Sequence, residues 1–352
     1  MSKKIAVLTC GGTIAMRSEE GGALHPALTG QELVNRIPNL QQTDTEFDVI
    51  EVFNKDSTNV TPEDWTTLAH KISEVCGKYS GIIVPHGTDT MAYTASAISL
   101  AFGRQLPTSI IFTGSQLPLG ELRSDAERNV ESAVQVAIAA SRENIKEVMI
   151  VFDDRVLRGN RTIKTSEINF DAFDSPAFPH LADLTADSNT VFSPLANKTP
   201  PEEGELLTNA TFSRGVLEIS ANTTTNPEML IPSVLGAKCQ AIILRSVGAG
   251  NVPDDDANSQ NEKVLYSFLP LIKAAMAAGK SAILTSSFVG GRARPDMYAP
   301  GVAALKAGAG HAGNMTDVTA KVKLMWLLAQ GVTAPNDVNE KMLVPTAGEL
   351  DP

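Results

Sequence analysis

The sequence predicts an α/β protein of two domains: a larger N-terminal one with a mostly parallel sheet and flanking helices, and a smaller C-terminal α/β one. The order strand, polar loop, helix recurs at least four times in the first half of the chain, which is typical of parallel sheets with right-handed crossovers. The strand candidate Gly81–Pro85 is a short apolar run, as expected of a strand buried on both faces. A Pro- and Glu-rich stretch near residue 200 then interrupts the pattern.

The N-terminal part alternates between apolar strand candidates and helix candidates. The strand candidates are Lys4–Thr9, Asp48–Phe53, Gly81–Pro85, Thr108–Thr113 and Glu147–Phe152. The helix candidates are Gly30–Ile37, Thr61–Cys76, Met91–Phe102 and Leu122–Ala140. The second helix has a clear start, because Thr61 is a capping residue, Pro62 suits the first helical position, and acidic residues follow. Residues 17–26 are expected to form a loop.

Residues 188–209 contain three prolines and three glutamates without periodicity, which is typical of a linker. We therefore expect an N-terminal domain with the catalytic loops at 1–190, an interdomain linker at 191–211, and a C-terminal α/β domain at 212–352. The C-terminal strand candidates are Gly215–Ile219, Ala241–Leu244 and Ser281–Leu284. The C-terminal helix candidates are Asn226–Leu235, Asn261–Ala278 and Met315–Leu328.

Composition narrows the classes of function. The chain has 352 residues, of which 43% are hydrophobic and 20% charged, as in soluble proteins with a large core. A net charge of -11 argues against nucleic acid and anionic membranes as partners. No apolar run approaches the ~20 residues that span a bilayer, and the N-terminus lacks a signal-peptide pattern. Three widely spaced cysteines indicate reduced thiols and a cytoplasmic location. Five scattered histidines without a ligand motif predict no metal site.

Polar residues follow the strand candidates of the first domain. They are Thr13, Ser57 and Thr58, Thr88 and Asp89, Ser115, and Lys164. If the strands are parallel, these residues gather on one rim of the sheet, where α/β proteins bind ligands. Thr and Asp before a helix are also ordinary capping residues, so residues 86–90 carry chemistry only if other segments bring matching groups to them.

This set of residues suits acyl transfer from an amide. A hydroxyl nucleophile needs a base, a lysine serves if burial keeps it partly neutral, and an aspartate holds it in place. Backbone N–H groups at Gly11, Gly12 and Thr13 would stabilise an oxyanion. The dinucleotide-binding, P-loop and nucleophile-elbow motifs are absent. A protein that only binds a small ligand remains open, because fold does not fix function.

Two motifs then point to a family. The run TCGGTIA at residues 9–15 resembles the first signature of bacterial L-asparaginases, the asparaginase/glutaminase family, and HGTDTM at 86–91 resembles the second. The runs TGSQLP at 113–118, ELRSD at 121–125 and RGNRT at 158–162 are similar to the cytosolic, type I branch. The resemblance covers essentially the whole chain and implies no cofactor and no metal.

The resemblance implies roles for individual residues. Thr13 would be the nucleophile, and Thr88, Asp89 and Lys164 would form a polar triad that handles protons. The remaining contacts to substrate are expected from Gly12, Ser57, Thr58, Gly87, Ser115 and Asn251. Among these, Ser57 and Asp89 would hold the α-carboxylate and α-amino groups. A neighbouring subunit would supply Asn251, since the family forms tetramers built as dimers of dimers; a homodimer is the alternative.

The sequence also departs from the family pattern. Family members usually carry a tyrosine in the loop after the first motif, but residues 20–26 contain none, and His25 is the polar candidate in its place. Cys10 stands where threonine is more usual, and we interpret it as a packed residue rather than a nucleophile.

The expected activity is hydrolysis of the side-chain amide of L-asparagine to L-aspartate and ammonia. Two alternatives remain open at this stage. One is a glutaminase-asparaginase of broader amide specificity, since one methylene separates the two substrates and is worth only ~1–3 kcal/mol. The other is a catalytically weak amino-acid sensor, which the missing tyrosine favours.

Overall fold

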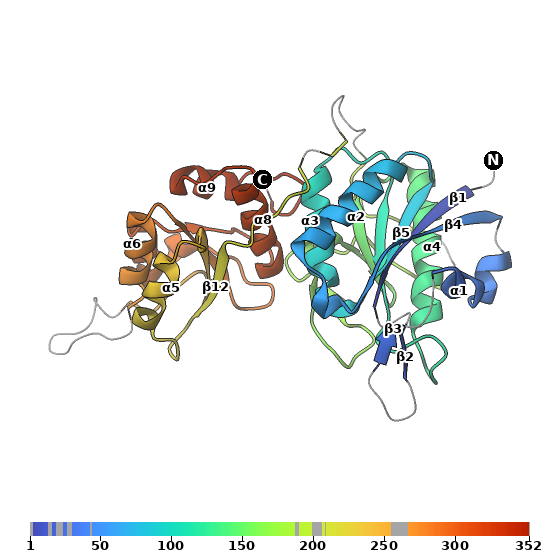
Figure 1. The fold of residues 1–352 in the computed structure, drawn as a ribbon, viewed down its shortest axis with the longest axis horizontal. Helices are drawn as coiled ribbons and strands as arrows, with labels where there is room; N and C mark the ends of the chain where they lie inside the picture. The colour runs from blue at the N-terminus through green and yellow to red at the C-terminus, as the bar shows by residue number, and fades with distance from the viewer. Residues whose placement is uncertain are drawn as a thin grey trace. The chain divides into compact units, whose positions relative to one another are not determined.

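The computed structural model describes residues 3–12, 16–18, 24–26, 30–42, 44–186, 190–198, 206–207, 209–254 and 267–351. The chain forms two compact units, residues 1–210 and 211–352 (Figure 1). In the stretch expected to be a linker, Phe192 and Ala196 lie in the hydrophobic core of the first unit. We therefore propose that the division between domains falls close to residue 210.

The first unit is built on a seven-stranded sheet with the strand order β11-β8-β7-β6-β5-β1-β4. Its strands are β1 (Lys3–Gly11), β4 (Thr45–Lys55), β5 (Gly81–Pro85), β6 (Ile110–Thr113), β7 (Val148–Phe152), β8 (Arg155–Arg158) and β11 (Ala182–Asp183). The neighbours β4, β1, β5, β6 and β7 pair in parallel. The antiparallel pairings are those of β8 with β7 and of β11 with β8. The predicted α/β class with a mostly parallel sheet is thus confirmed.

Helices cover both faces of this sheet. They are α1 (Gly30–Asn35), α2 (Pro62–Val75), α3 (Met91–Phe102) and α4 (Ala126–Glu143). Alternate residues of the strands feed two cores: Ile5 and Val7 pack with α1 and α4, whereas Ala6 and Leu8 pack with α2 and α3. Figure 1 shows these two helix pairs on opposite sides of the strands. Burial on both faces explains why β5, β6 and β7 are almost continuously apolar, whereas the edge strand β4 is only partly buried and carries charged residues.

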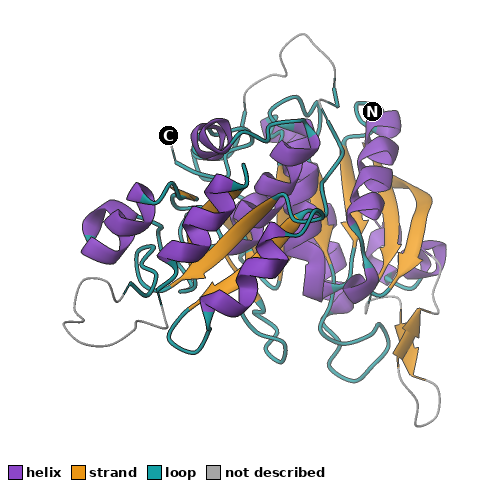
Figure 2. Cartoon of the chain, turned by 60° about the vertical axis from the view of Figure 1, so that its left-hand side comes forward, coloured by secondary structure: helices purple, strands orange, loops and turns teal. Residues whose placement is uncertain are grey.

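Some local predictions for the first unit were wrong. Residues 16–18 (β2, Met16–Ser18) and 24–26 (β3, Leu24–Pro26) form an antiparallel pair instead of a loop, and Figure 2 shows this small ribbon set apart from the sheet. The helix expected over Leu122–Ala140 begins at Ala126 and ends at Glu143. After β7 the chain turns back antiparallel through β8, and a second ribbon follows, made of β9 (Ile163–Lys164) and β10 (Phe173–Asp174).

The second unit has a four-stranded parallel sheet with the order β12-β13-β14-β15. Its strands are β12 (Val216–Ala221), β13 (Ala241–Ser246), β14 (Ser281–Ser286) and β15 (Gly310–His311). Its helices are α5 (Ile231–Leu235), α6 (Leu269–Ala277), α7 (Ala299–Lys306), α8 (Asp317–Ala329) and α9 (Pro335–Met342). The sequence did not predict β15, α7 and α9, which are short elements of two, eight and eight residues.

A buried ion pair fastens the C-terminal end of the second unit. Lys323 on α8 donates to Glu349 at 2.5 Å and to the carbonyls of Met342 and Val344 at 3.1 and 2.6 Å, and both ionised side chains are fully buried. Burial acts to raise the pKa of Glu349, but the charge and hydrogen bond of Lys323, with the N–H of Ala347, outweigh it and lower the pKa. The carboxylate therefore stays charged and ties the end of the chain to α8 and α9.

Among the described residues, no helix is long and apolar enough to cross a membrane, and no cluster of His, Cys, Asp and Glu side chains could hold a metal ion.

Candidate active site

The loops that follow the parallel strands meet at one edge of the first sheet, as predicted. A Cβ added at Gly12 would lie 2.2 Å from the Gly87 nitrogen, so the loops after β1 and β5 are in direct backbone contact. A Cβ added at Gly87 would lie 2.6 Å from the Ser57 hydroxyl oxygen, which places the loop after β4 against the same glycine. Glycine is required at both positions because any side chain would push these loops apart.

Lys164 comes to this cluster from the β9–β10 ribbon. Its ammonium donates to the Thr88 hydroxyl at 2.9 Å and to the Asp89 carboxylate at 2.7 Å. Thr88 is buried in the 3-10 helix η4 (Thr88–Thr90), whereas the Asp89 side chain is 60% exposed and that of Lys164 is 17% exposed. The three residues form a connected polar group with one end buried and the other open to solvent.

His86 fixes the backbone beneath this group. Its Nδ1 lies 2.8 Å from the Gly87 carbonyl, and its Nε2 lies 3.0 Å from the Thr94 hydroxyl. A carbonyl only accepts, so Nδ1 carries the proton and Nε2 accepts from Thr94. Burial lowers the pKa of His86 to about 4. The imidazole is therefore neutral near pH 7 and acts as a spacer between η4 and α3.

Ser57 and Thr58 lie in the 3-10 helix η3 (Ser57–Asn59), which Asp56 caps by accepting from the Thr58 N–H at 2.8 Å. The Thr90 hydroxyl donates to the Ser57 carbonyl at 2.7 Å and fastens η3 to η4. The two loops therefore keep a fixed spacing, with the Ser57 hydroxyl next to Gly87.

The loop after β6 carries Ser115. Asp125 accepts from the N–H groups of Gln116 and Leu117 at 3.0 and 3.1 Å, and the Asn129 amide donates to the Gly114 carbonyl at 2.9 Å. Ser115 is fully buried, and its hydroxyl finds no hydrogen-bond partner among the described residues. A buried hydroxyl without a partner is costly, so this one suits contact with a bound molecule.

Three predicted residues are not part of this described cluster. Thr13 lies outside the described residues, and so does most of the stretch without a tyrosine. His25 belongs to β3, opposite Arg17. Asn251 lies in the second unit, where its backbone pairs with Val247 at 3.0 Å in both directions and its side-chain oxygen is buried without a partner in the described part of the chain. Cys10 is buried, and burial raises the pKa of its thiol, in keeping with a packed residue.

Sequence reasoning missed the residues that support the loops, namely His86, Thr94, Asp125 and Asn129. Three of them carried a signal: His86 stands in the motif at residues 86–91, and Asp125 and Asn129 are polar residues four apart at the start of an otherwise apolar helix face. Nothing local indicated that Thr94, in the middle of an Ala-rich helix, faces His86.

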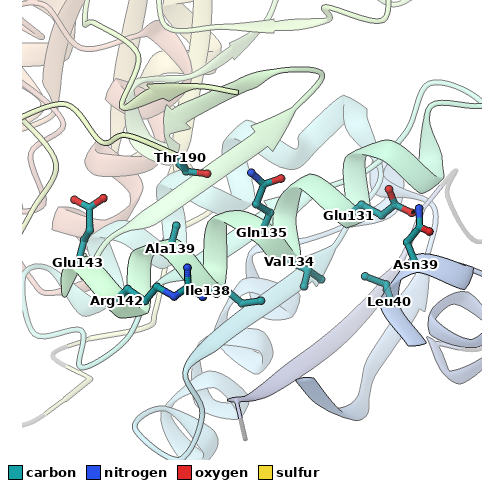
Figure 3. Close-up of a pocket in the computed structure, with 10 residues that line it drawn as sticks. All are labelled: Asn39, Leu40, Glu131, Val134, Gln135, Ile138, Ala139, Arg142, Glu143 and Thr190. Carbon is teal, nitrogen blue, oxygen red and sulfur yellow. Dashed lines mark hydrogen bonds between the residues drawn. The ribbon is translucent and has the colours of Figure 1, made fainter. Parts of the chain in front are cut away.

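A separate groove of about 480 Å³ lies along α4 (Figure 3). Side chains of α4 and of residues 39 and 40 line it together with Thr190, and Figure 3 shows Glu131 and Arg142 toward opposite ends of the helix. None of the predicted site residues lines it. The groove is therefore distinct from the loop cluster at the carboxyl edge.

Comparisons with known proteins agree with this architecture. The family described as "Asparaginase, N-terminal" matches residues 4–196, and "Glutaminase/Asparaginase C-terminal domain" matches residues 219–342. L-asparaginase 1 of Escherichia coli K12 is 33% identical over 99% of this chain and 98% of its own. The thermostable L-asparaginase of Thermococcus kodakarensis has a TM-score of 0.86 at 28% identity, covering 99% of both chains. L-asparaginase I of Vibrio cholerae has a TM-score of 0.83 at 29% identity, covering 100% of both chains.

Proposed function

This chain belongs to the asparaginase family, and from that premise we propose that it hydrolyses L-asparagine to L-aspartate and ammonia. The observation that carries the proposal is the contact of Lys164 with Thr88 and Asp89 in a cluster of loops at the carboxyl edge. Lys164 lies 75 positions after Asp89 and 76 positions after Thr88 in the chain. Their contact supplies the acid–base group that a threonine nucleophile needs.

In the proposed reaction, the Thr13 hydroxyl oxygen attacks the carbon of the side-chain amide. For this step Lys164 acts as a neutral amine: the Thr13 proton passes through Thr88 to the Lys164 amine. The resulting ammonium returns a proton through the same relay to the amide nitrogen, which leaves as ammonia. An ester on Thr13 remains, and water activated by the same relay hydrolyses it to L-aspartate and restores the hydroxyl. Gly12, which precedes Thr13, touches Gly87, which precedes Thr88, and this contact supports a close approach of the two threonines.

The substrate is held by the groups around this relay. Ser57 and Asp89 bind the α-carboxylate and α-amino groups, with Thr58 beside them, and the Asp89 carboxylate has the exposure that an incoming ammonium needs. Backbone around Thr88 and Ser115 approaches the amide oxygen. The buried Ser115 hydroxyl, without a partner among the described residues, supports this placement.

A neighbouring subunit completes the site with Asn251 in a homotetramer of the dimer-of-dimers type. Support comes from the second unit, where large apolar side chains are exposed on the loops near Asn251. These side chains are Val247, Phe288, Val289, Met297 and Tyr298. Exposed apolar groups of this size are typical of interaction surfaces. The three free cysteines support a cytoplasmic location.

Ammonia release from L-Asn, L-Gln and D-Asn, measured side by side, tests the activity. We expect release from L-Asn to be fastest. Comparable rates with L-Gln would identify a glutaminase-asparaginase. Thermal stabilisation by L-Asn without any ammonia would contradict the proposal and identify a sensor.

Two variants test the residue roles. Thr13→Ala should abolish ammonia release and leave the melting temperature unchanged. If this variant retains most of the activity, Thr13 is not the nucleophile. Thr88→Val removes a hydroxyl at nearly equal volume, and we expect it to lower kcat by about 10²-fold or more. Thr67→Val is the matched control and should keep full activity, because the exposed Thr67 on α2 donates its hydroxyl to the Glu63 carbonyl of the same helix.

A further inference from the structure

His180 lies between two carboxylates of the first unit. Its Nε2 is 3.0 Å from Asp174 Oδ1, and its Nδ1 is 2.7 Å from Asp183 Oδ1. Ionised carboxylates only accept hydrogen bonds, and a neutral imidazole has a single N–H. Both contacts are satisfied together only when the ring carries two protons, so the geometry calls for an imidazolium.

The two carboxylates belong to different sheets. Asp183 is on β11, which pairs with β8 at the edge of the main sheet, whereas Asp174 is on β10, which pairs with β9. In that ribbon Phe173 lies opposite Lys164, and Asp174 lies opposite Ile163. His180 therefore ties the ribbon that carries Lys164 to the edge of the main sheet.

The ribbon is too short to hold itself in place. Its ladder has two residue pairs, extended by hydrogen bonds to the Ala172 carbonyl from the N–H groups of Thr165 at 2.8 Å and Ser166 at 3.4 Å. An isolated two-stranded ribbon is marginal in water. Its other anchors include the buried Phe173 ring and a hydrogen bond of 3.2 Å from Arg155 to the Phe173 carbonyl. Ser175 also donates to the Arg161 carbonyl at 3.1 Å, and Gln116 to the Asn169 carbonyl at 2.9 Å. The contact through His180 is the ionic anchor on the Asp174 side.

The charges around His180 favour its protonated form. Burial acts to lower the pKa of His180, but the hydrogen bonds to Asp174 and Asp183 and their negative charges outweigh it, so the pKa is raised. Burial likewise acts to raise the pKa of Asp174, and its hydrogen bonds with His180 and Ser175 and the nearby charge of Arg155 lower it overall. Arg155 itself lies 3.7 Å from Asp171.

We propose that His180, as an imidazolium, is a positioning residue for Lys164: it holds the β9–β10 ribbon so that the ammonium of Lys164 stays in reach of Thr88 and Asp89. The role rests on the proposed function. When His180 loses a proton, one ring nitrogen turns a lone pair toward a carboxylate, and that contact becomes repulsive. We call the contact of His180 with Asp174 and Asp183 the clamp. The clamp is complete at pH values between the lowered pKa of Asp174 and the raised pKa of His180. It opens as the pH rises through the pKa of His180.

His180→Gln tests the clamp, with His70→Gln, an exposed histidine on α2, as the matched control. Hydrogen exchange of the amides in residues 163–175 is measured at pH 6 by mass spectrometry. We expect the Thr165 amide to exchange about fivefold faster in His180→Gln, the size of effect that one kcal/mol produces. His70→Gln should match the wild type. Wild-type exchange, corrected for its intrinsic pH dependence, should approach that of His180→Gln as pH rises.

Two further measurements report on the accessibility and the function of Lys164. The rate at which a soluble anhydride acylates Lys164, followed by peptide mass spectrometry at pH 7, should rise about fivefold in His180→Gln. In the same variant kcat for L-Asn should fall by a similar factor with KM little changed, and Asp183→Asn should reproduce the change. Combining the two substitutions should add nothing, because they break one contact.

Unchanged exchange in His180→Gln would overturn the clamp, and faster exchange with unchanged Lys164 acylation would overturn the positioning role. If wild-type protein releases no ammonia, the proposed function fails on that result alone. Exchange and acylation still decide the inference about His180 in that case, because neither uses the substrate.

Discussion

Two of the lysine–carboxylate pairs, one in each unit, have similar distances and different surroundings. Lys164 meets Asp89 at 2.7 Å with 17% and 60% of the side chains exposed, while Lys323 meets Glu349 at 2.5 Å with both fully buried. Lys323 also donates to two backbone carbonyls, and Glu349 accepts from the N–H groups of Thr346 and Ala347. Both charges of the buried pair are thus fully hydrogen-bonded within the protein.

The difference teaches what burial does to an ion pair. A buried charge must find all its partners within the protein, so removing one partner leaves an uncompensated charge. A half-exposed pair keeps water as an alternative partner, and its groups remain free to exchange partners with a substrate. The first arrangement suits holding the chain together, and the second suits handling protons.

Breaking the buried pair should have the largest effect on stability. Lys323→Met leaves Glu349 charged without its partner, and we expect the free energy of unfolding to fall by about 3–5 kcal/mol. Urea denaturation measures the change. Lys321→Met is the matched control on the same helix, since Lys321 makes a half-exposed pair with Glu218 worth only about 0.2–1 kcal/mol. Equal losses in both variants would show that burial does not distinguish the pairs.

Breaking the half-exposed pair should act on rate instead. For Lys164→Met we expect kcat to fall by about 10²–10³-fold, or roughly 3–4 kcal/mol of transition-state stabilisation. The free energy of unfolding should change by less than about 1 kcal/mol. Ammonia release and urea denaturation on the same preparation check both parts. A large loss of stability with the rate intact would reverse the assignment of the two pairs.

His86 sharpens the comparison, because it is a buried ionisable group without an opposite charge. Its pKa is about 4 in the folded protein and about 6.5 when unfolded. The unfolded chain binds more protons between these values, so the free energy of unfolding should fall as pH drops from about 6.5 to 4, by about 3 kcal/mol. Urea denaturation of wild type and His86→Gln across this range isolates the contribution. The variant should lack it; parallel curves would contradict the buried neutral imidazole.

The smallest effect is expected from Lys55, whose ammonium contacts Asp64 at 2.7 Å near the start of α2. Its side chain is 39% exposed, and Asp64 keeps its hydrogen bonds from Thr61 when Lys55 is removed. Lys55→Met should therefore lower the free energy of unfolding by no more than about 1 kcal/mol. If Lys55→Met loses as much free energy of unfolding as Lys323→Met, the exposure of an ion pair does not determine its contribution to stability.

The sequence by itself determined the parallel strands and which polar residues follow them. A strand buried on both faces must be apolar throughout, so β5 is visible as Gly81–Pro85 and the polar run after it marks the rim of the sheet. The motifs at residues 9–15 and 86–91 added the family, and the family matches bear it out. Strand position and motif identity are local properties of the chain, so they can be predicted from short stretches of sequence.

Tertiary structure alone decided which distant side chains meet. Lys164 reaches Thr88 across 76 positions only because the chain reverses after β7 and forms a second ribbon. The buried pair of Lys323 and Glu349 likewise joins residues 26 positions apart. Such contacts follow from topology and packing, which no single stretch of residues encodes, so the sequence named the chemical groups and the fold gave them their partners.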